Sequence, residues 1–144
     1  MDENILNNLS DNLDVLDIEE TLTRVVVTAK SSKNEDTCPH CEQVSNKIHQ
    51  RFIKWIQDLP INKKDTLIRL KVRIFRCDNA NCNHFSFTEQ FDFVRPSEKK
   101  TQRLIDLILE LSKEFGCREV ASILNKDGVV ISKATVNNIY RKYK

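Results

Sequence analysis

Four cysteines form two closely spaced pairs that could hold one metal ion. Two residues separate Cys38 from Cys41, and four residues separate Cys77 from Cys82. Two thiolates from each of two short loops can complete a tetrahedral zinc site. When cysteine fills all four positions, none stays open for water or substrate, so the sequence predicts one structural Zn²⁺ per chain rather than a catalytic metal.

The alternatives to this site are unrelated buried cysteines, a redox Cys-x2-Cys pair, or histidine ligands. A redox pair would leave the second pair of cysteines unexplained, and no βαβ pattern surrounds the first pair. His40 lies inside the first pair and His84 follows Cys82 by two residues. Both histidines are rival ligands that we expect to be bystanders. Cys117 is more typical of a small buried apolar residue than of a reactive thiol.

Strands are expected to position the cysteine pairs. Residues 68–74 alternate apolar and basic side chains and run directly into Cys77, which predicts a half-buried strand. The phenylalanines of 85–93 predict a second, antiparallel strand after Cys82, with their rings on one side. The sequence therefore predicts a small antiparallel zinc-ribbon-like β module over residues 37–95.

The segment before the cysteines is expected to be an acidic N-terminal arm, residues 1–36. Its apolar spacing predicts one or two short helices within 3–22, and its β-branched run predicts a strand at 23–30. After the first cysteine pair, residues 44–59 are ambiguous, and we favour strands over a helix. A turn is expected at 59–64.

The last third of the chain changes to a helical pattern. Apolar residues recur at three and four residue intervals over 104–115, and Gly116 is expected to end that helix. A second helix is predicted at 118–126, followed by a turn. A third is predicted at 132–143, where Ser132 can serve as the N-cap. The predicted fold class is therefore α+β, with the β module followed by a three-helix module.

The last two predicted helices have the proportions of a helix-turn-helix, in a domain spanning residues 97–144. The outer face of the final helix suits the major groove, because asparagine can pair with adenine, and arginine or lysine with guanine. The predicted DNA-binding residues are Lys133, Ala134, Asn137, Asn138 and Arg141 on this face, with Arg118 and Lys142 placed for phosphates. The alternative is a plain helical hairpin with a solvated polar face.

Charge supports a polyanionic partner. Residues 1–36 hold nine acidic and three basic side chains, whereas residues 37–144 hold twelve acidic and twenty basic ones. A basic body attracts nucleic acid through counterion release. The strands offer a second candidate DNA surface, for which an ordinary solvated sheet face is the alternative. Its members are Arg51, Lys54, Trp55, Arg69, Lys71 and Arg73.

Targeting signals are not apparent in the sequence. No apolar run reaches the length of a membrane span, and the acidic start Met1-Asp2-Glu3-Asn4 differs from a secretory signal. We therefore expect a cytoplasmic protein that associates with the nucleoid when bound to DNA.

Several motifs follow one another in a distinctive order along the chain. They are Cys38-Pro39-His40-Cys41, Asp58-Leu59-Pro60, Val72-Arg73-Ile74-Phe75-Arg76-Cys77-Asp78-Asn79, Cys82 and Phe87. This order resembles that of the ISL-three family of insertion-sequence transposases. The later stretches Glu119-Val120-Ala121-Ser122-Ile123-Leu124 and Ser132-Lys133-Ala134-Thr135-Val136 are similar to that family's helix-turn-helix. The resemblance implies a bacterial zinc-binding and DNA-binding region that recognises terminal inverted repeats on double-stranded DNA.

The resemblance also implies limits on activity. In the family a catalytic domain with an acidic, metal-binding triad follows, and no acidic residue of this chain matches the triad. We therefore expect a non-enzymatic DNA-binding portion of a truncated or split transposase, which forms a homodimer or associates with a separate catalytic chain. The alternatives are a stand-alone repressor derived from a transposase and a zinc-ribbon module that binds protein.

Overall fold

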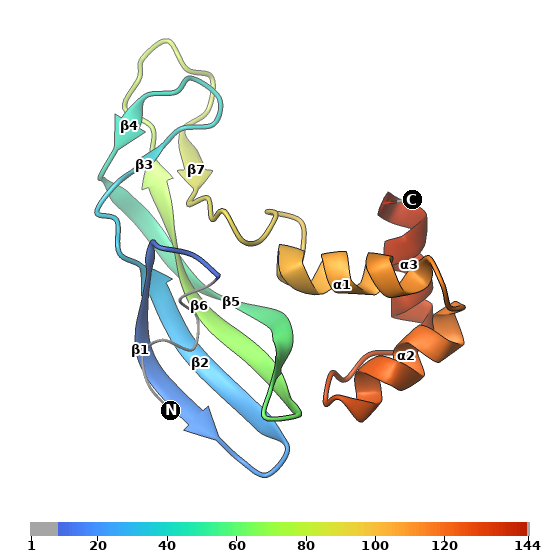
Figure 1. Cartoon of the computed structure of the whole chain (residues 1–144). Coiled ribbons are helices and arrows are strands. Elements are labelled where there is room, and N and C mark those ends of the chain that lie inside the picture. The colour runs from blue at the N-terminus through green and yellow to red at the C-terminus, as the bar shows by residue number, and fades with distance from the viewer. Residues whose placement is uncertain (1–8, 144) are drawn as a thin grey trace.

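A computed structural model describes residues 9–143 as an α+β fold (Figure 1). The strands are β1 (Leu13–Glu20), β2 (Arg24–Ser31), β3 (Asp36–Thr37), β4 (Val44–Ser45), β5 (Ile48–Ile61), β6 (Lys64–Arg76) and β7 (Ser86–Thr88). The helices are α1 (Gln102–Ser112), α2 (Cys117–Lys126) and α3 (Lys133–Tyr143). No described helix has the length and apolarity that crossing a membrane requires.

The long β5–β6 hairpin is the central element of the fold. The expected turn lies at Asn62 and Lys63, which both have positive φ, at 54° and 58°. Such a left-handed pair gives a twist that matches two antiparallel strands. The ambiguous stretch before this turn is a strand, as favoured, because its apolar residues pair in register with the alternating β6.

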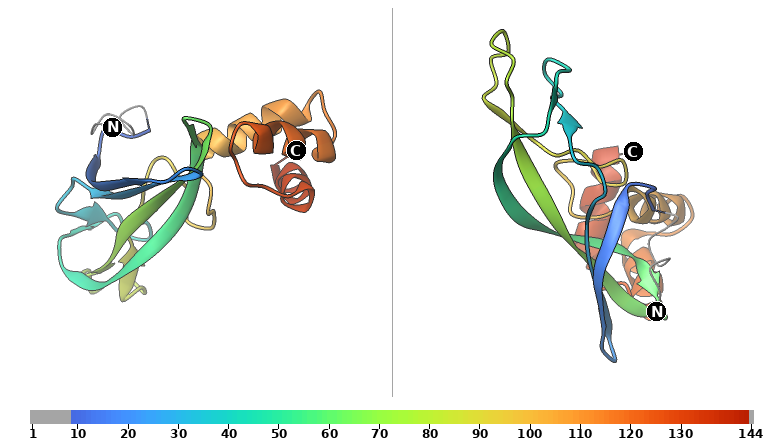
Figure 2. Two further views of the ribbon diagram at one scale, coloured as in Figure 1. Left: turned by 90° about the horizontal axis from the view of Figure 1, so that it is seen from below. Right: turned by 90° about the vertical axis from the view of Figure 1, so that its left-hand side faces the viewer.

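The main sheet is mixed rather than purely antiparallel. Its order is β1-β2-β6-β5, with β7 also paired to β6. β2 runs parallel to β6, whereas the other pairs are antiparallel. The sheet curls around its core, and the three helices lie beside it (Figure 2). The buried core residues are Val25, Val27, Ala29, Ile56, Ile68, Leu70, Val72, Phe93 and Val94.

The N-terminal prediction needs correction. Where helices were expected within 3–22, the described part forms β1, and residues 1–8 lie outside the described residues. The register between β1 and β2 shifts between Val15 and Asp17, which leaves Leu16 as a bulged, exposed residue. This extra residue breaks the period of two and mimics helical spacing. Because β2 pairs with β6, the expected acidic arm contributes two strands to the same sheet.

The strand expected over 85–93 is also shorter than predicted. Only the three residues of β7 pair with β6, and the phenylalanines do not share one side. Phe87 is buried near the cysteines and Phe93 in the sheet core, while Phe85 is 56% exposed. The strand ends at Glu89, whose backbone N–H still donates to the Arg73 carbonyl, while its carboxylate accepts hydrogen bonds from the backbone N–H and the guanidinium of Arg73.

The three helices appear where the sequence places them and pack around their own core. The core residues are Leu104, Ile105, Ile108, Val120, Ala121, Leu124, Val129, Ile131, Val136 and Ile139. The predicted cap is confirmed, since the Ser132 hydroxyl accepts from the Thr135 backbone N–H at 3.1 Å. The prediction that Gly116 ends the first helix is wrong. α1 already ends at Ser112, and Gly116 is the N-cap of α2 with an ordinary φ of −72°.

A buried polar network joins the helices to the far end of the β5–β6 hairpin. The fully buried Asp58 carboxylate accepts from the Arg103 guanidinium at 2.5 and 2.8 Å and from the Thr101 hydroxyl at 2.7 Å. Thr101 is the N-cap of α1. The turn before α3 also rests on the hairpin, because a Cβ on Gly128 would lie 2.3 Å from the Lys63 carbonyl oxygen. This interface fixes the helices against the sheet.

Candidate metal centre and nucleic-acid interface

The first cysteine pair sits in the tight hairpin between β3 and β4. The Cys38 N–H donates to the Gln43 carbonyl at 2.9 Å, and the Glu42 N–H donates to the Cys38 carbonyl at 2.8 Å. Glu42 takes a positive φ of 64°, which reverses the chain within two residues of Cys41. Within this tight hairpin the Sγ atoms of Cys38 and Cys41 lie within 4.8 Å of each other.

The second pair lies where the β6 strand runs into the loop before β7. The Cys77 N–H donates to the Phe85 carbonyl at 2.9 Å, and the Cys82 N–H donates to the Asn79 carbonyl at 3.0 Å. The two loops are joined directly, since the Ser45 hydroxyl donates to the carbonyl of Arg76 at 2.6 Å. Strand pairing therefore brings together two cysteine pairs that are more than 30 residues apart in sequence.

The sulfur atoms meet the requirements of one tetrahedral ion. All four Sγ atoms lie within 4.8 Å of one another, and the Cys41 and Cys77 Sγ atoms are 3.5 Å apart. A tetrahedron with Zn–S bonds of about 2.3 Å places its sulfurs about 3.8 Å apart. The geometry and the all-thiol donor set therefore fit one structural Zn²⁺ held by Cys38, Cys41, Cys77 and Cys82.

The electrostatics of the cluster also favour a cation. Hydrogen bonds from the Asn79 side chain and the Gln43 backbone lower the pKa of the Cys41 thiol to about 6. The Asn79 backbone N–H also lowers the pKa of Cys77, but burial and the neighbouring thiols outweigh it and raise the pKa to about 12. A thiolate at one cysteine thus disfavours ionisation of its neighbours. A bound dication offsets this repulsion between negative charges by coordinating all four sulfur atoms.

The two histidines near the cluster face each other instead of the sulfurs. The rings of His40 and His84 stack with centroids 3.4 Å apart and planes within 6° of parallel. Both residues are exposed. Among the described residues, the cluster that could hold a metal consists of cysteines alone. The two histidines are therefore not ligands, and their stacked rings form a contact between the two cysteine loops.

The zinc loops have only a small apolar support. Its buried members are Cys38, Phe75 and Phe87, against which the other three cysteines pack. Phe75 and Phe87 are cross-strand partners on β6 and β7, with ring centroids 5.6 Å apart. The fifth cysteine, Cys117, lies far along the chain and packs against the helical core, in keeping with its expected apolar role.

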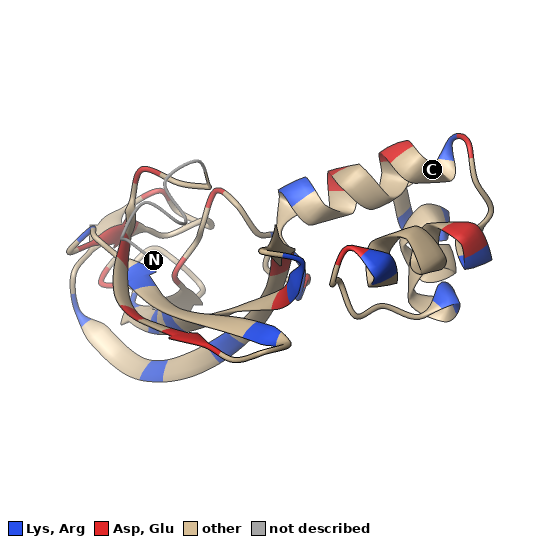
Figure 3. Ribbon diagram, turned by 60° about the horizontal axis from the view of Figure 1, so that its bottom comes forward, with Lys and Arg blue, Asp and Glu red and all other residues tan. Residues whose placement is uncertain are grey.

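The predicted DNA-binding side chains of α3 lie on one side of that helix. Val136 and Ile139 are buried against the other helices, whereas Lys133, Ala134, Asn138 and Arg141 are exposed and Asn137 is half-buried. Figure 3 shows basic segments on α3 and on the neighbouring helices. The outward set thus has the helical spacing that a groove-reading face needs.

The two residues expected to contact phosphates differ in their surroundings. Arg118 is exposed in the first turn of α2. Lys142, by contrast, is hydrogen bonded to the carboxylate of Glu98, which also accepts from the Tyr143 hydroxyl at 2.5 Å. This bond raises the pKa of Lys142. The sequence gives no local signal for the role of Glu98, because its partner Lys142 lies 44 residues away.

Comparison with known proteins places the cysteine region in context. Residues 34–82 match the family model described as the zinc-finger of transposase IS204/IS1001/IS1096/IS1165, and this span includes all four clustered cysteines. No curated protein and no solved structure matches the chain significantly. The zinc-finger part of the expected resemblance is confirmed. The chain thus carries a region similar to a transposase zinc finger, with four cysteines that fit one structural Zn²⁺.

Proposed function

We propose that this protein is the DNA-binding portion of a transposase, which recognises the ends of an insertion sequence on double-stranded DNA. The match of residues 34–82 to a transposase zinc finger is the observation that supports this proposal most directly. The matched region has a structural rather than a catalytic metal geometry, since cysteines fill all four positions. The proposed role is therefore to find DNA.

The proposed reading element is α3. Its inward residues are buried among the helices, which leaves the polar side chains of Lys133, Asn137 and Arg141 on the other side. Asparagine can read adenine through two hydrogen bonds, and arginine can read guanine in the same way. The proposed phosphate contact is Arg118, which is exposed in the first turn of α2, because the first helix of a helix-turn-helix crosses the DNA backbone.

The proposed role of the sheet is to hold α3 in a fixed orientation. The zinc loops close one end of the β5–β6 hairpin, and the Asp58 network fixes α1 to the other end. A base-reading helix needs this rigidity, because a displacement of about 1 Å already weakens a site that depends on geometry. Zinc would then act on DNA binding indirectly, through the sheet.

The direct test is the salt dependence of duplex binding by the zinc-loaded chain. Affinity for a labelled duplex should fall steeply between about 50 and 200 mM salt, because each phosphate contact releases counterions. A selection from a randomised duplex pool should also return a recurrent sequence. Weak binding that does not change with salt, for every duplex tested, would overturn the proposal.

Substitutions can separate base reading from phosphate contact. Asn137→Ala should reduce the preference for one base pair by about 1–3 kcal/mol of binding free energy. Arg118→Ala should weaken binding to all duplexes alike and make the affinity depend less steeply on salt concentration. Lys113→Glu is the matched control, because Lys113 is exposed at the end of α1 and, within residues 9–143, forms an ion pair with Glu110 alone. Equal effects of all three changes would argue against α3 as the reading helix.

A further inference from the structure

One face of the main sheet carries no apolar core. Residues directly opposite each other in a strand pair lie on the same face, so Arg51 shares a face with Arg73, Ile53 with Lys71, and Trp55 with Arg69. The parallel register adds Lys30 beside Lys71. The core residues all lie on the other side. We use the name outer face for Lys30, Arg51, Ile53, Trp55, Arg69 and Lys71.

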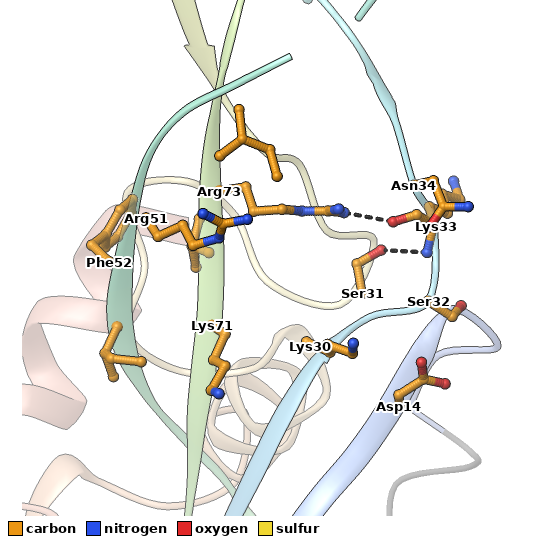
Figure 4. Close-up of a pocket in the computed structure, with 13 residues that line it drawn as sticks. Asp14, Lys30, Ser31, Ser32, Lys33, Asn34, Arg51, Phe52, Lys71 and Arg73 are labelled. Atoms are coloured by element: carbon orange, nitrogen blue, oxygen red, sulfur yellow. Dashed lines mark hydrogen bonds between the residues drawn. The ribbon is translucent and has the colours of Figure 1, made fainter. Parts of the chain in front are cut away.

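A basic cavity opens on this outer face beside the segment that leads into the first zinc loop. Its volume is about 570 Å³, and its lining includes five basic side chains and the single acidic side chain of Asp14. Figure 4 shows the Arg73 side chain reaching from β6 to the Lys33 carbonyl, with Arg51 beside it. A cavity with this excess of positive charge suits a phosphate group.

Most of this positive charge is uncompensated. Arg73 is paired with Glu89 at 2.5 Å. In the described part of the chain, Lys30, Arg51 and Lys71 take part in none of the ion pairs. These side chains therefore remain available to an anion from outside the molecule.

An exposed tryptophan lies two residues along β5 from this cavity. Trp55 is 48% exposed and Ile53, between it and Arg51, is 38% exposed. Arg69 lies directly opposite Trp55 on β6. An exposed indole beside basic residues is a stacking platform for a nucleic-acid base. Bases in a duplex are stacked on each other, so only an unpaired base can offer its face to Trp55.

Acidic residues define where such a strand could run. Asp14, Asp17 and Glu19 of β1 lie opposite β2 residues that are on the same side of the sheet as the outer face. They would repel a phosphate backbone. The favourable path therefore follows β5 and β6, from the basic cavity to Trp55.

We propose that the outer face binds single-stranded DNA, with a phosphate in the basic cavity and a base stacked on Trp55. This inference is separate from duplex reading by α3, and neither depends on the other. It gives the molecule two nucleic-acid surfaces on different elements, one for paired and one for unpaired DNA.

The single tryptophan makes the test direct. Single-stranded oligothymidylate of about 12 nucleotides, added to the zinc-loaded full chain, should quench Trp55 fluorescence. Binding of the same labelled oligonucleotide, followed by anisotropy, should weaken roughly five- to a hundredfold in Trp55→Ala. Trp55→Phe keeps an aromatic ring and should retain most of the affinity.

Two further variants keep the test independent of the tryptophan. Lys71→Glu should weaken single-strand binding and lower its salt slope, because a phosphate contact is lost. Leu22→Ala is the matched control, since this side chain is 94% exposed in the β1–β2 turn and away from the outer face. Its affinity for oligothymidylate should equal that of the wild type.

The outcomes separate this proposal from the α3 proposal. Unchanged fluorescence with saturating oligothymidylate would overturn the inference, as would wild-type affinity in both Trp55→Ala and Lys71→Glu. Equal loss of single-strand and duplex binding in Trp55→Ala would also overturn it, because one surface would then serve both. Loss of duplex binding in Arg141→Glu with single-strand binding retained supports two surfaces.

Discussion

The two ends of the β5–β6 hairpin are held by different forces. At the zinc end, the two cysteine loops rest on three buried residues, and four thiols share a space of less than 5 Å. At the helical end, ten buried apolar residues form a separate core, and the Asp58 network ties it to the sheet. We therefore expect the zinc end to need a metal in order to fold, whereas the helical end buries enough apolar surface to fold without one.

This difference follows from how much apolar surface each end can bury. Burial contributes roughly 25 cal/mol per Å² of apolar surface, so a core of three residues cannot offset the cost of ordering two loops. Metal coordination supplies the missing free energy. Zinc removal should therefore unfold the cysteine loops locally and leave the helical end folded.

Loss of the metal should have the largest effect. Cys77→Ser should bind no zinc at neutral pH, where metal analysis of the wild type gives one zinc per chain, because a three-thiolate site binds far more weakly. Amide protons of the cysteine loops, including Cys38 N–H and Cys77 N–H, should then exchange rapidly while α1–α3 stay protected. Cys117→Ser is the matched control and should keep the full zinc content.

The result of hydrogen exchange decides whether the two ends are separate. If zinc removal also speeds amide exchange in the helical core, the two ends unfold as one unit and are not stabilised independently. If the cysteine loops stay protected without metal, their three-residue core is sufficient and the zinc is dispensable for folding.

Loss of the Asp58 carboxylate should have the next largest effect. Asp58→Ala should lower the free energy of unfolding by about 2–4 kcal/mol, since Arg103 and the Thr101 hydroxyl lose a buried partner. Urea unfolding followed by the helical circular dichroism signal measures this change. Glu110→Ala, which removes an exposed pair with Lys113, should change it by less than about 0.5 kcal/mol. Similar losses in both variants would contradict the buried network.

The two glycines offer a matched pair at the helical end. Gly128→Ala should cost about 1–3 kcal/mol, because φ is +101° and a Cβ would lie 2.3 Å from the Lys63 carbonyl oxygen. Gly116→Ala should change stability by no more than about 0.5 kcal/mol, since nothing lies within 4 Å of its Cβ position. Thermal unfolding compares them, and equal melting temperatures would mean that the turn does not contact the hairpin.

The N-cap of α3 should give the smallest effect. Ser132→Ala removes the acceptor for the Thr135 N–H and should destabilise the protein by about 1 kcal/mol, with the zinc content unchanged. A urea midpoint equal to that of the wild type would show that the cap is not used in solution.

Local chemistry explains which features the sequence could predict. The metal site was predictable because the Cys-x2-Cys and Cys-x4-Cys spacings each indicate a short loop that can hold a metal ion. Strand β6 was predictable because its apolar and basic residues alternate without interruption. The helices were predictable from apolar spacing, and Ser132 from its place before α3. In each case the signal lies within a few neighbouring residues.

Long-range pairing explains the features that were missed. The bulge at Leu16 interrupts the alternating pattern of β1, so its apolar spacing indicated a helix instead of a strand. No local pattern indicates that β2 runs parallel to β6. The strand predicted over 85–93 ends early at Glu89, whose side-chain contact with Arg73 lies 16 residues away in sequence. Asp58 belongs to one of the segments that resemble the transposase family, but its structural role depends on Thr101 and Arg103, more than 40 residues away in sequence.

The most direct test of the account is duplex binding by a charge reversal on α3. Arg141→Glu, in the zinc-loaded chain, should lose at least tenfold in affinity for a duplex recovered by selection, with a smaller salt slope. Lys113→Glu should bind like the wild type. Unchanged affinity in Arg141→Glu, with zinc and helix content intact, would contradict DNA recognition through α3.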